Sequence, residues 1–398
     1  MKGRIGYSHF LTKSEETDMS ATLQEACYEN TTAVYMALEL SNKQWKVLIG
    51  DGHHHRHKTV VAGDIAGLLE QIALFRAKWC VPSEAPVYSC YEAGRDGFWL
   101  HRCLLSHGVK NVVVDSSSIK VDQRARRMKT DRLDVKSLYG QLIRYVKGDD
   151  DVWRVVHVPS VEDEDRRRLY RERERLISEQ GQHTNRIKSL LVLHGIRMEL
   201  RKDFAEQLDT LCQWDGTPLP TELRDELRRE WHRREQVQAQ LKELHELQKT
   251  RIAAAVCGEG PEGLIKQLMI LKSVGWQSAW SLVMELFGWR HFRNRRELAG
   301  CTGLNPSPYN SGDSEREQGI SKAGNRRVRR ILIELAWLWL RYQPDSALTR
   351  WFNERWAGQG KRGRRVGIVA VARRLVIALW KYLETGEIPA GAVLKPAV

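Results

Sequence analysis

Hydrophobic runs and polar breaks alternate at short intervals between residues 33 and 150. Apolar runs rich in β-branched and aromatic residues predict strands at 33–40, 45–50, 58–62, 86–91 and 111–115. Longer segments with apolar residues every three or four positions predict helices at 64–79, 96–107 and 131–146. This alternation predicts one α/β domain over residues 31–150, preceded by a polar segment at 1–30.

The pattern changes to dense, alternating charge between residues 155 and 256. The segment 214–220, with one glycine and two prolines, predicts a turn between two long helices. We expect these helices to form an antiparallel coiled-coil arm, although polar residues interrupt the heptads and a plain helical bundle fits the same pattern. The apolar positions are Leu169, Leu176, Ile187 and Leu190 in the first stretch, with His183 in the same seam, and Leu223, Leu227, Val237, Leu241 and Leu244 in the second.

The last region, residues 260–398, is predicted to be a mostly helical domain. The segment 303–314 interrupts it, and its two prolines and two glycines predict an irregular loop. Ser321 is predicted to cap the next helix, on which Arg326 and Arg330 share a face, as does Lys322 if the helix begins early. The basic residues that lead into the apolar helical run at 331–340 are Lys322, Arg326, Arg327, Arg329 and Arg330.

Basic residues outnumber acidic ones, so the chain of 398 residues has a formal net charge of +14. The excess is concentrated in residues 322–374, where 14 Lys and Arg stand against three acidic residues. A solvated basic face is the ordinary explanation, but so local an excess favours nucleic acid as a partner. Further candidates for phosphate contacts in this stretch are Lys361, Arg362, Arg364 and Arg365.

Cysteine usage and hydropathy indicate in which cellular compartment the protein is expected. The seven cysteines are scattered without a CxxC pair, which is typical of a reducing cytoplasm and argues against a zinc site or a disulfide framework. No apolar run reaches the roughly 18 residues that a membrane span needs, and the N-terminus has no signal-peptide core. We therefore expect a cytoplasmic protein without a membrane partner.

Four acidic residues fall where an RNase-H-like sheet would bring them to one point: Glu39, Glu92, Asp131 and Asp134. The two glutamates close apolar runs, and the two aspartates are three residues apart, so a helix places both on one face. Grouped carboxylates repel unless cations neutralise them, and oxygen-only ligation suits Mg²⁺ or Mn²⁺. Two such ions about 3.5–4 Å apart can clamp the attacking and leaving oxygens of a phosphodiester. The alternative is four unrelated surface acids.

Ser311 lies in the predicted loop before the arginine-rich helix. A serine hydroxyl is a weak nucleophile unless a base or local positive charge lowers its effective pKa, and an arginine cluster provides such charge. A turn-forming serine is the ordinary alternative. The histidine tract at 53–57 likewise allows a metal site or, more simply, a solvated hairpin tip.

Four segments, taken in order and spacing, resemble the DEDD transposases of bacterial insertion sequences, which are related to the Piv-type DNA invertases. The segments are YEAGRDG at 91–97, KTDRLD at 129–134, PYNSG at 308–312 and GISKAGNR at 319–326. The resemblance covers residues 33–390. It implies an N-terminal RuvC-like nuclease domain of the RNase-H-like class, a coiled coil, and a C-terminal transposase domain with a nucleophilic serine.

By the matching motifs, the resemblance assigns metal ligation and catalysis to Glu39, Glu92, Asp131 and Asp134, and the nucleophile to Ser311. The family's first acid is usually aspartate, and the extra methylene of Glu39 moves its carboxylate outward, which allows contact with metal through one oxygen or through water. The resemblance also implies cutting and rejoining of donor and target DNA through a covalent phosphoserine. It further implies guidance by a structured bridge RNA encoded by the element, and a homo-oligomer in which dimers assemble to a tetramer.

Two other functions fit the same residues. One is a junction-resolving nuclease that uses metal-activated water, in which Ser311 is structural. The other is a non-catalytic nucleic-acid-binding protein with a decayed acidic site, for which the glutamate at position 39 is the best support. A covalent protein–DNA adduct distinguishes a recombinase from the first alternative, and dependence on a divalent metal distinguishes it from the second.

Overall fold

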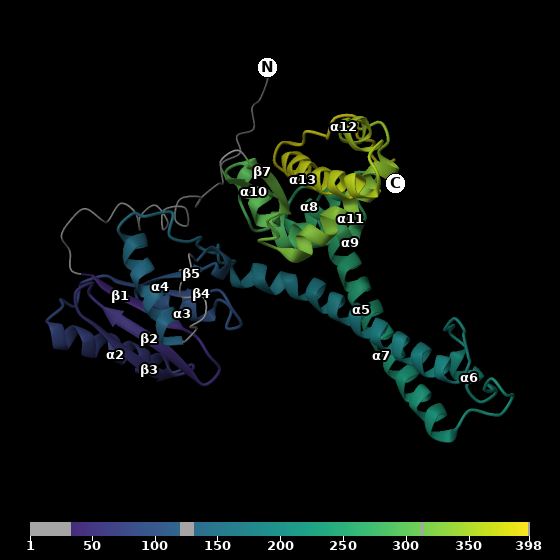
Figure 1. Ribbon diagram of the computed structural model, residues 1–398, viewed down its shortest axis with the longest axis horizontal. Coiled ribbons are helices and arrows are strands. Elements are labelled where there is room, and N and C mark those ends of the chain that lie inside the picture. The colour runs from purple at the N-terminus through teal and green to yellow at the C-terminus, as the bar shows by residue number, and fades with distance from the viewer. Residues whose placement is uncertain (1–32, 120–130, 312–313, 397–398) are drawn as a thin grey trace, which may run out of the picture. The chain divides into compact units, whose positions relative to one another are not determined.

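The computed structural model describes residues 33–119, 131–311 and 314–396, and for residues 131–133, 308–311 and 314–318 it describes the backbone alone. The chain divides into two compact units, with the boundary between Val158 and Pro159. Figure 1 labels the helices and strands of both units. The predicted polar segment at 1–30 lies outside the described residues.

The first unit is built on a five-stranded sheet in the order β3-β2-β1-β4-β5 (Figure 1). The central strand β1 (Val34–Glu39) pairs antiparallel with β2 (Gln44–Gly50), which pairs antiparallel with β3 (His55–Val61). On its other side β1 pairs parallel with β4 (Val87–Glu92), and β4 pairs parallel with β5 (Val109–Val114). All five predicted strands are confirmed, and the RNase-H-like identity of the sheet stays a prediction.

Helices cover both faces of this sheet. Successive residues of β1 point to opposite faces, and residues 34–38 are all buried, so both faces pack against helices. Its even-numbered residues pack against α2 (Ile65–Trp79) and α3 (Trp99–Ser106). Its odd-numbered residues pack against α4 (Asp131–Val146), which contributes Val135, Leu138 and Leu142. The short 3₁₀ helix η1 (Ser116–Ser118) follows β5. The α/β architecture predicted for this region is therefore confirmed.

The histidine tract forms the turn between β2 and β3 and the start of β3. The carboxylate of Asp51 accepts hydrogen bonds from the backbone N–H groups of His53 and His54, at 2.8 and 2.6 Å. The ladder between β2 and β3 extends to the pair Gly50 and His55, so β3 begins three residues earlier than predicted. Residues 52–55 are exposed, in agreement with a solvated hairpin tip.

The second unit begins with two long helices, α5 (Val161–Leu193) and α7 (Thr221–Ala254), which run antiparallel along each other (Figure 1). Their direction follows from the bonds between them, Arg186 with Glu226 and Arg173 with His245. The connection at 194–220 contains the short helix α6 (Phe204–Gln207) and turns at 214–216 as predicted. The two-helix arm is thus confirmed, and its description as a coiled coil stays a prediction.

The remaining helices share one apolar core with the base of the arm, which includes Tyr170 of α5 and Ile252 of α7. The mostly helical character predicted for residues 260–398 is confirmed. No helix among the described residues is both long and apolar enough to cross a membrane. The segments are α8 (Gly260–Met269), α9 (Trp276–Leu282), the π-helix η3 (Val283–Phe287), α10 (Arg295–Thr302), α11 (Arg326–Tyr342), α12 (Ala347–Trp356) and α13 (Lys361–Thr385).

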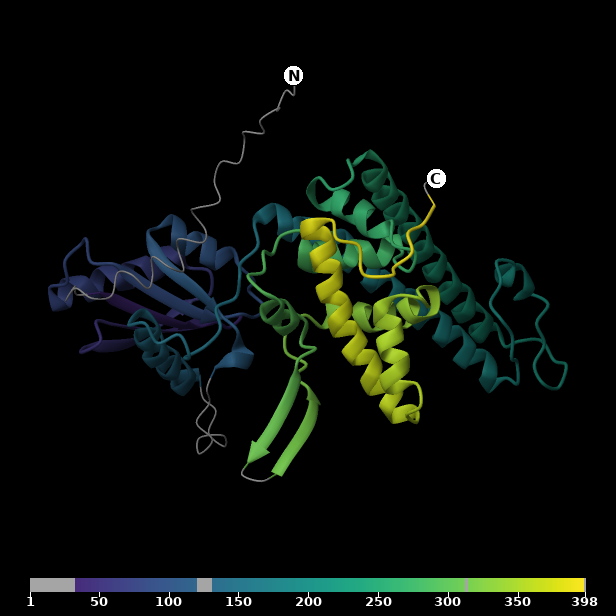
Figure 2. The same ribbon diagram turned by 90° about the horizontal axis from the view of Figure 1, so that it is seen from above.

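The prediction of an irregular loop at 303–314 is wrong, because most of this segment belongs to a two-stranded β-ribbon. β6 (Pro306–Ser311) pairs antiparallel with β7 (Ser314–Ile320), and Figure 2 shows the ribbon projecting from the helices of this unit. A two-stranded ribbon has two free edges, so proline is tolerated where no ladder hydrogen bond is needed. The register also shifts between Pro306 and Pro308, which relieves the pairing there.

Candidate active site

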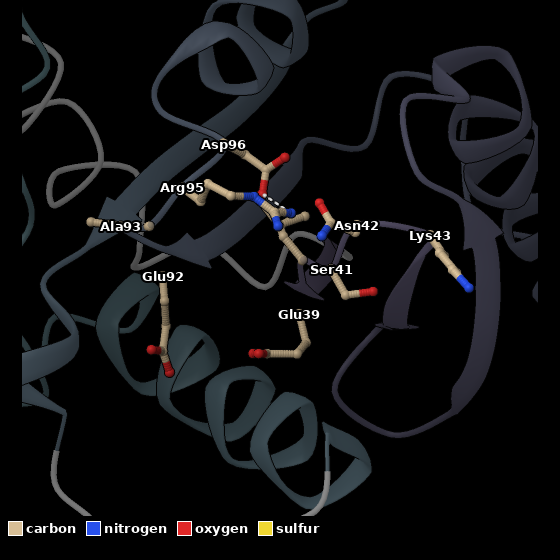
Figure 3. Close-up of a pocket in the computed structure, with 10 residues that line it drawn as sticks. Glu39, Ser41, Asn42, Lys43, Glu92, Ala93, Arg95 and Asp96 are labelled. Atoms are coloured by element: carbon tan, nitrogen blue, oxygen red, sulfur yellow. Dashed lines mark ion pairs between the residues drawn. The ribbon is translucent and has the colours of Figure 1, made fainter. Parts of the chain in front are cut away.

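Glu39 and Glu92 end two neighbouring parallel strands, β1 and β4, whose register places Leu38 opposite Tyr91. The carboxyl ends of neighbouring parallel strands meet at one edge of the sheet, so the two glutamates lie close together there. Both are half-buried, and both line an open pocket of about 670 Å³. Figure 3 shows the Glu39 side chain bending toward the side on which Glu92 lies. The structure therefore brings together two of the four predicted acids.

Polar residues from two loops complete this pocket (Figure 3). Asn42 and Lys43 come from the turn between β1 and β2, and Arg95 and Asp96 come from the loop after β4. The guanidinium of Arg95 lies 3.8 Å from the carboxylate of Asp96. The sequence did not predict these residues as part of the site, although Arg95 and Asp96 fall within the motif at 91–97. Lys43 and Arg95 bring positive charge to a pocket in which the carboxylates are negative.

Asp131 and Asp134 open α4, which packs against β1, β2 and β4. Asp134 is half-buried and is not among the residues that line the pocket. The side chain of Asp131 lies outside the described residues. Within the part of the chain that the structure describes, no three His, Cys, Asp or Glu side chains form a group that could hold a metal ion. Metal binding by the tetrad therefore stays a prediction.

The chemistry of the pocket suits a hard divalent cation. The acidic residues that line it are Glu39, Glu92 and Asp96, of which Asp96 pairs with Arg95, and neither histidine nor cysteine lines it. Cys90, on the same strand as Glu92, is fully buried. Burial, and then the charge of Glu92, raises the pKa of the Cys90 thiol, which stays protonated and so is no metal ligand. Carboxylate oxygens are what Mg²⁺ and Mn²⁺ prefer, and the residues present fit the predicted ion.

Ser311 is the last residue of β6 and pairs with Ser314 of β7, while its side chain lies outside the described residues. The base of the ribbon is fixed by backbone hydrogen bonds. The N–H of Ser321 donates to the carbonyl of Asn305 at 2.8 Å, and the N–H of Lys322 donates to the carbonyl of Gly303 at 3.1 Å. These bonds tie the ribbon to the end of α10.

The predicted helix cap at Ser321 is wrong. Asn325 caps α11, and its side-chain oxygen accepts hydrogen bonds from the N–H groups of Arg327 and Val328. Ser321 is instead held at the ribbon base, four residues before the cap Asn325. Lys322 has a φ of 56° and lies outside the helix, so it does not share a helical face with Arg326.

The arginines at the start of α11 differ in the ion pairs and hydrogen bonds that they make with other residues of the chain. Arg327 Nε lies 2.5 Å from Glu174 Oε2 on α5, and Arg330 pairs with the same carboxylate. Arg329 donates to two backbone carbonyls within its own unit, at 3.1 and 3.2 Å. Arg326 is exposed and has no ion pair within the described ranges. Arg326 is therefore the arginine of this turn most available to a phosphate.

A second acid, Glu285 of η3, holds the cap of the same helix. Its side chain is 1% exposed, and its carboxylate accepts hydrogen bonds from Arg171 at 2.8 and 3.0 Å and from the Asn325 amide at 3.0 Å. Burial by itself would raise the pKa of Glu285, but the hydrogen bonds and positive charge of Arg171, with the Asn325 bond and the charge of Arg167, hold it below its usual range. Glu285 is therefore ionised at neutral pH.

Of these two acids, only Glu285 could have been singled out from the sequence pattern. Glu285 is a lone acid in the apolar run at 282–287, a pattern that indicates a buried charge with a partner. Glu174 lies within the alternating charges of α5 and has no comparable signal.

Four cations open α13: Lys361, Arg362, Arg364 and Arg365. All are exposed, and the first turn has no acid. Positive charge is unfavourable at a helix N-terminus, because it repels the helix dipole, so helix stability does not explain these residues. Phosphate contact gives them a function, which stays a prediction.

Comparison with known proteins identifies the family. The profile described as the transposase IS116/IS110/IS902 family matches residues 265–350, which include the β6–β7 ribbon and α11. The chain is 40% identical to the transposase y4rJ of Sinorhizobium fredii over 376 residues, 91% of this chain and 95% of that protein. It is 25% identical to the transposase for insertion sequence element IS1111A of Coxiella burnetii over 314 residues, 77% of this chain and 78% of that protein. The chain therefore belongs to the IS116/IS110/IS902 family of transposases.

Proposed function

We propose that this transposase cuts and rejoins DNA through a covalent phosphoserine at Ser311, with Mg²⁺ or Mn²⁺ held by Glu39, Glu92, Asp131 and Asp134. The observation that carries the proposal is the pair of carboxylates that end β1 and β4 and line one pocket. The packing of α4 on the same strands supports the inclusion of its two aspartates. The position of Ser311 within the segment matched by the family profile supports the choice of nucleophile.

In this proposal the Ser311 oxygen attacks a DNA phosphorus. A serine–phosphorus bond forms, the bond from phosphorus to one deoxyribose oxygen breaks, and the serine proton passes through solvent to that oxygen, which leaves as a hydroxyl. A hydroxyl of another strand then attacks the phosphoserine: the new phosphodiester bond forms, the serine–phosphorus bond breaks, and the proton of that hydroxyl passes through solvent to the released serine oxygen. One phosphodiester is exchanged for another, so no ATP is required. A divalent cation bound by the carboxylates supplies positive charge to the anionic transition state.

Exposed cations of the second unit serve the nucleic acids in this proposal. Lys322 follows the ribbon and Arg326 opens α11, and positive charge there favours ionisation of a serine and stabilises a phosphoryl group. The basic start of α13 contacts phosphates. The partners are donor and target DNA and a structured guide RNA encoded by the element, and the active form is a homo-oligomer.

A covalent adduct is the test. Purified protein is incubated with Mg²⁺, candidate RNA and labelled DNA, and the products are examined for a protease-sensitive protein–DNA species. Ser311→Ala is expected to remove the adduct, Ser311→Cys to keep slight activity, and the matched control Ser314→Ala to form it normally. Mass spectrometry of the DNA-linked peptide then identifies the serine. A link to another serine contradicts the proposal, and cleavage without any adduct favours the junction-resolving nuclease.

A further inference from the structure

A second pocket, of about 980 Å³, opens on the arm of the second unit. It is formed by α7, by Gln180 of α5 and by the segment that follows α5. None of its four cations makes an ion pair with a carboxylate among the described residues, so their charge is available to a ligand. These cations are Arg201, Lys202, Arg234 and Lys242.

Two acids and one histidine also line this pocket, and they leave its charge positive. Glu246 accepts a hydrogen bond from Lys249 at 3.0 Å, and that bond and the charge of Lys249 lower the Glu246 pKa. Glu235 is exposed. Burial, and then the charge of Arg173, lowers the pKa of His245, which is therefore neutral at pH 7. Four lining cations and Lys249 thus face two carboxylates.

Arg234 is held in a fixed orientation. Its Nε donates to the Thr184 hydroxyl at 3.1 Å, and its guanidinium lies 4.7 Å from the centre of the Trp231 ring. Lys242 lies eight residues further along α7, a rise of about 12 Å. The four cations are thus spread along the pocket rather than gathered at one residue position. A ligand that carries negative charges along its length can engage several of them at once.

We propose that this pocket binds the phosphodiester backbone of a nucleic acid, as an anchoring surface separate from the predicted catalytic residues. The inference rests on the proposed function, in which RNA and DNA are both partners. The chemistry that the cations recognise is common to both, and the choice between them is made by the experiment below. Each phosphate contact releases counterions, so each adds about 0.9 to the slope of log Kobs against log salt for a duplex.

The test removes two exposed lysines of the pocket, Lys202→Gln with Lys242→Gln, and measures binding of a labelled RNA hairpin and of a labelled DNA duplex of equal length. The slope is expected to fall by about 1.8 for the nucleic acid that occupies the pocket. The matched control, Arg229→Gln with Arg251→Gln, removes the same charge from exposed positions of α7 outside the pocket and is expected to keep the wild-type slope.

Each result has one meaning. A change with RNA alone or with DNA alone supports the pocket and identifies its occupant, and a change with both supports a surface that either can use. If the wild-type protein binds RNA and DNA and the double variant has unchanged slopes with both, the pocket does not bind nucleic acid, and the proposed function is unaffected. A wild-type protein that binds neither nucleic acid overturns the pocket and the proposed function together.

Discussion

Arg327, in the first turn of α11, donates from Nε to the carboxylate of Glu174 on α5 at 2.5 Å. Arg330, one turn later, bonds the same carboxylate, and the Tyr170 hydroxyl reaches it at 3.2 Å. A carboxylate between two arginines occupies a position that a phosphate could take. Two of the residues predicted to bind nucleic acid are therefore paired with one acid of the same chain, whose single charge offsets part of theirs.

Glu174→Gln is expected to tighten nucleic-acid binding, because it releases Arg327 and leaves Arg330 with the longer 3.8 Å ion pair to the exposed Glu334. The slope of log Kobs against log salt should steepen by about 0.9 to 1.8, measured by fluorescence anisotropy over a salt series. Loss of these two ion pairs should cost less than about 1 kcal/mol of unfolding free energy, because the side chains of Arg327 and Arg330 are 44% and 59% exposed. Glu172→Gln, at an exposed position of α5, is the control. Weaker binding by Glu174→Gln would mean that Glu174 positions α11 for binding and does not compete with phosphates for its arginines.

Glu285→Gln is expected to lower the free energy of unfolding by about 1–2 kcal/mol at pH 7, because the charged bonds to the half-exposed Arg171 are lost. The folded pKa of Glu285 is depressed, so its stabilising effect is fully present above the unfolded value of about 4.3 and is lost as the pH falls through the folded value. The difference in unfolding free energy between the wild type and Glu285→Gln should therefore narrow below about pH 4.3.

Chemical denaturation at a series of pH values measures this effect. Glu243→Gln, which changes an exposed acid of α7, should have the same free energy of unfolding as the wild type at each pH. A difference between the wild type and Glu285→Gln that stays constant into the acid range would exclude ionised Glu285 as its cause.

The acidic site should fail when its aspartates are removed. Asp131→Ala or Asp134→Ala is expected to abolish strand cleavage and leave RNA binding largely intact, because metal ligation and backbone contacts are separate tasks. EDTA should stop cleavage by the wild type, and added Mg²⁺ or Mn²⁺ should restore it. Full cleavage by either alanine variant in Mg²⁺ contradicts the tetrad.

Position 39 allows a finer comparison. Glu39→Asp restores the residue usual in the resembling family and is expected to keep activity, whereas Glu39→Ala is expected to lose it. The readout is the cleavage rate in Mg²⁺. If the aspartate variant is as inactive as the alanine variant, the longer reach of glutamate is required in this pocket.

Arg364→Gln with Arg365→Gln should flatten the salt dependence of nucleic-acid binding by about 1.8, at about 0.9 for each lost contact. Both residues are exposed at the start of α13, so the fold should be retained. Arg341→Gln with Arg350→Gln removes the same charge from exposed positions of α11 and α12 and serves as the comparison. An unchanged slope would make the start of α13 a solvated face.

Local pattern was enough to locate the strands and the ends on which the glutamates lie. The runs at 33–40 and 86–91 are short, apolar and bounded by polar residues, so strand formation there depends on near neighbours in the chain. The same reasoning located α4 and the two helices of the arm. It failed at 303–314, where prolines argued against pairing, because a ribbon whose edges stay free tolerates residues that a central strand excludes.

The tertiary structure decided which of the predicted acids meet and which charged residues pair across the chain. Glu39 and Glu92 became neighbours because β1 pairs with β4 rather than with another strand, and that choice depends on packing both sheet faces against helices. Glu174 and Arg327 are 153 residues apart, and Arg171 and Glu285 are 114 apart. A charged residue in a periodic pattern has no sequence signal for its partner at such separation, because the attraction acts only after the apolar faces have packed.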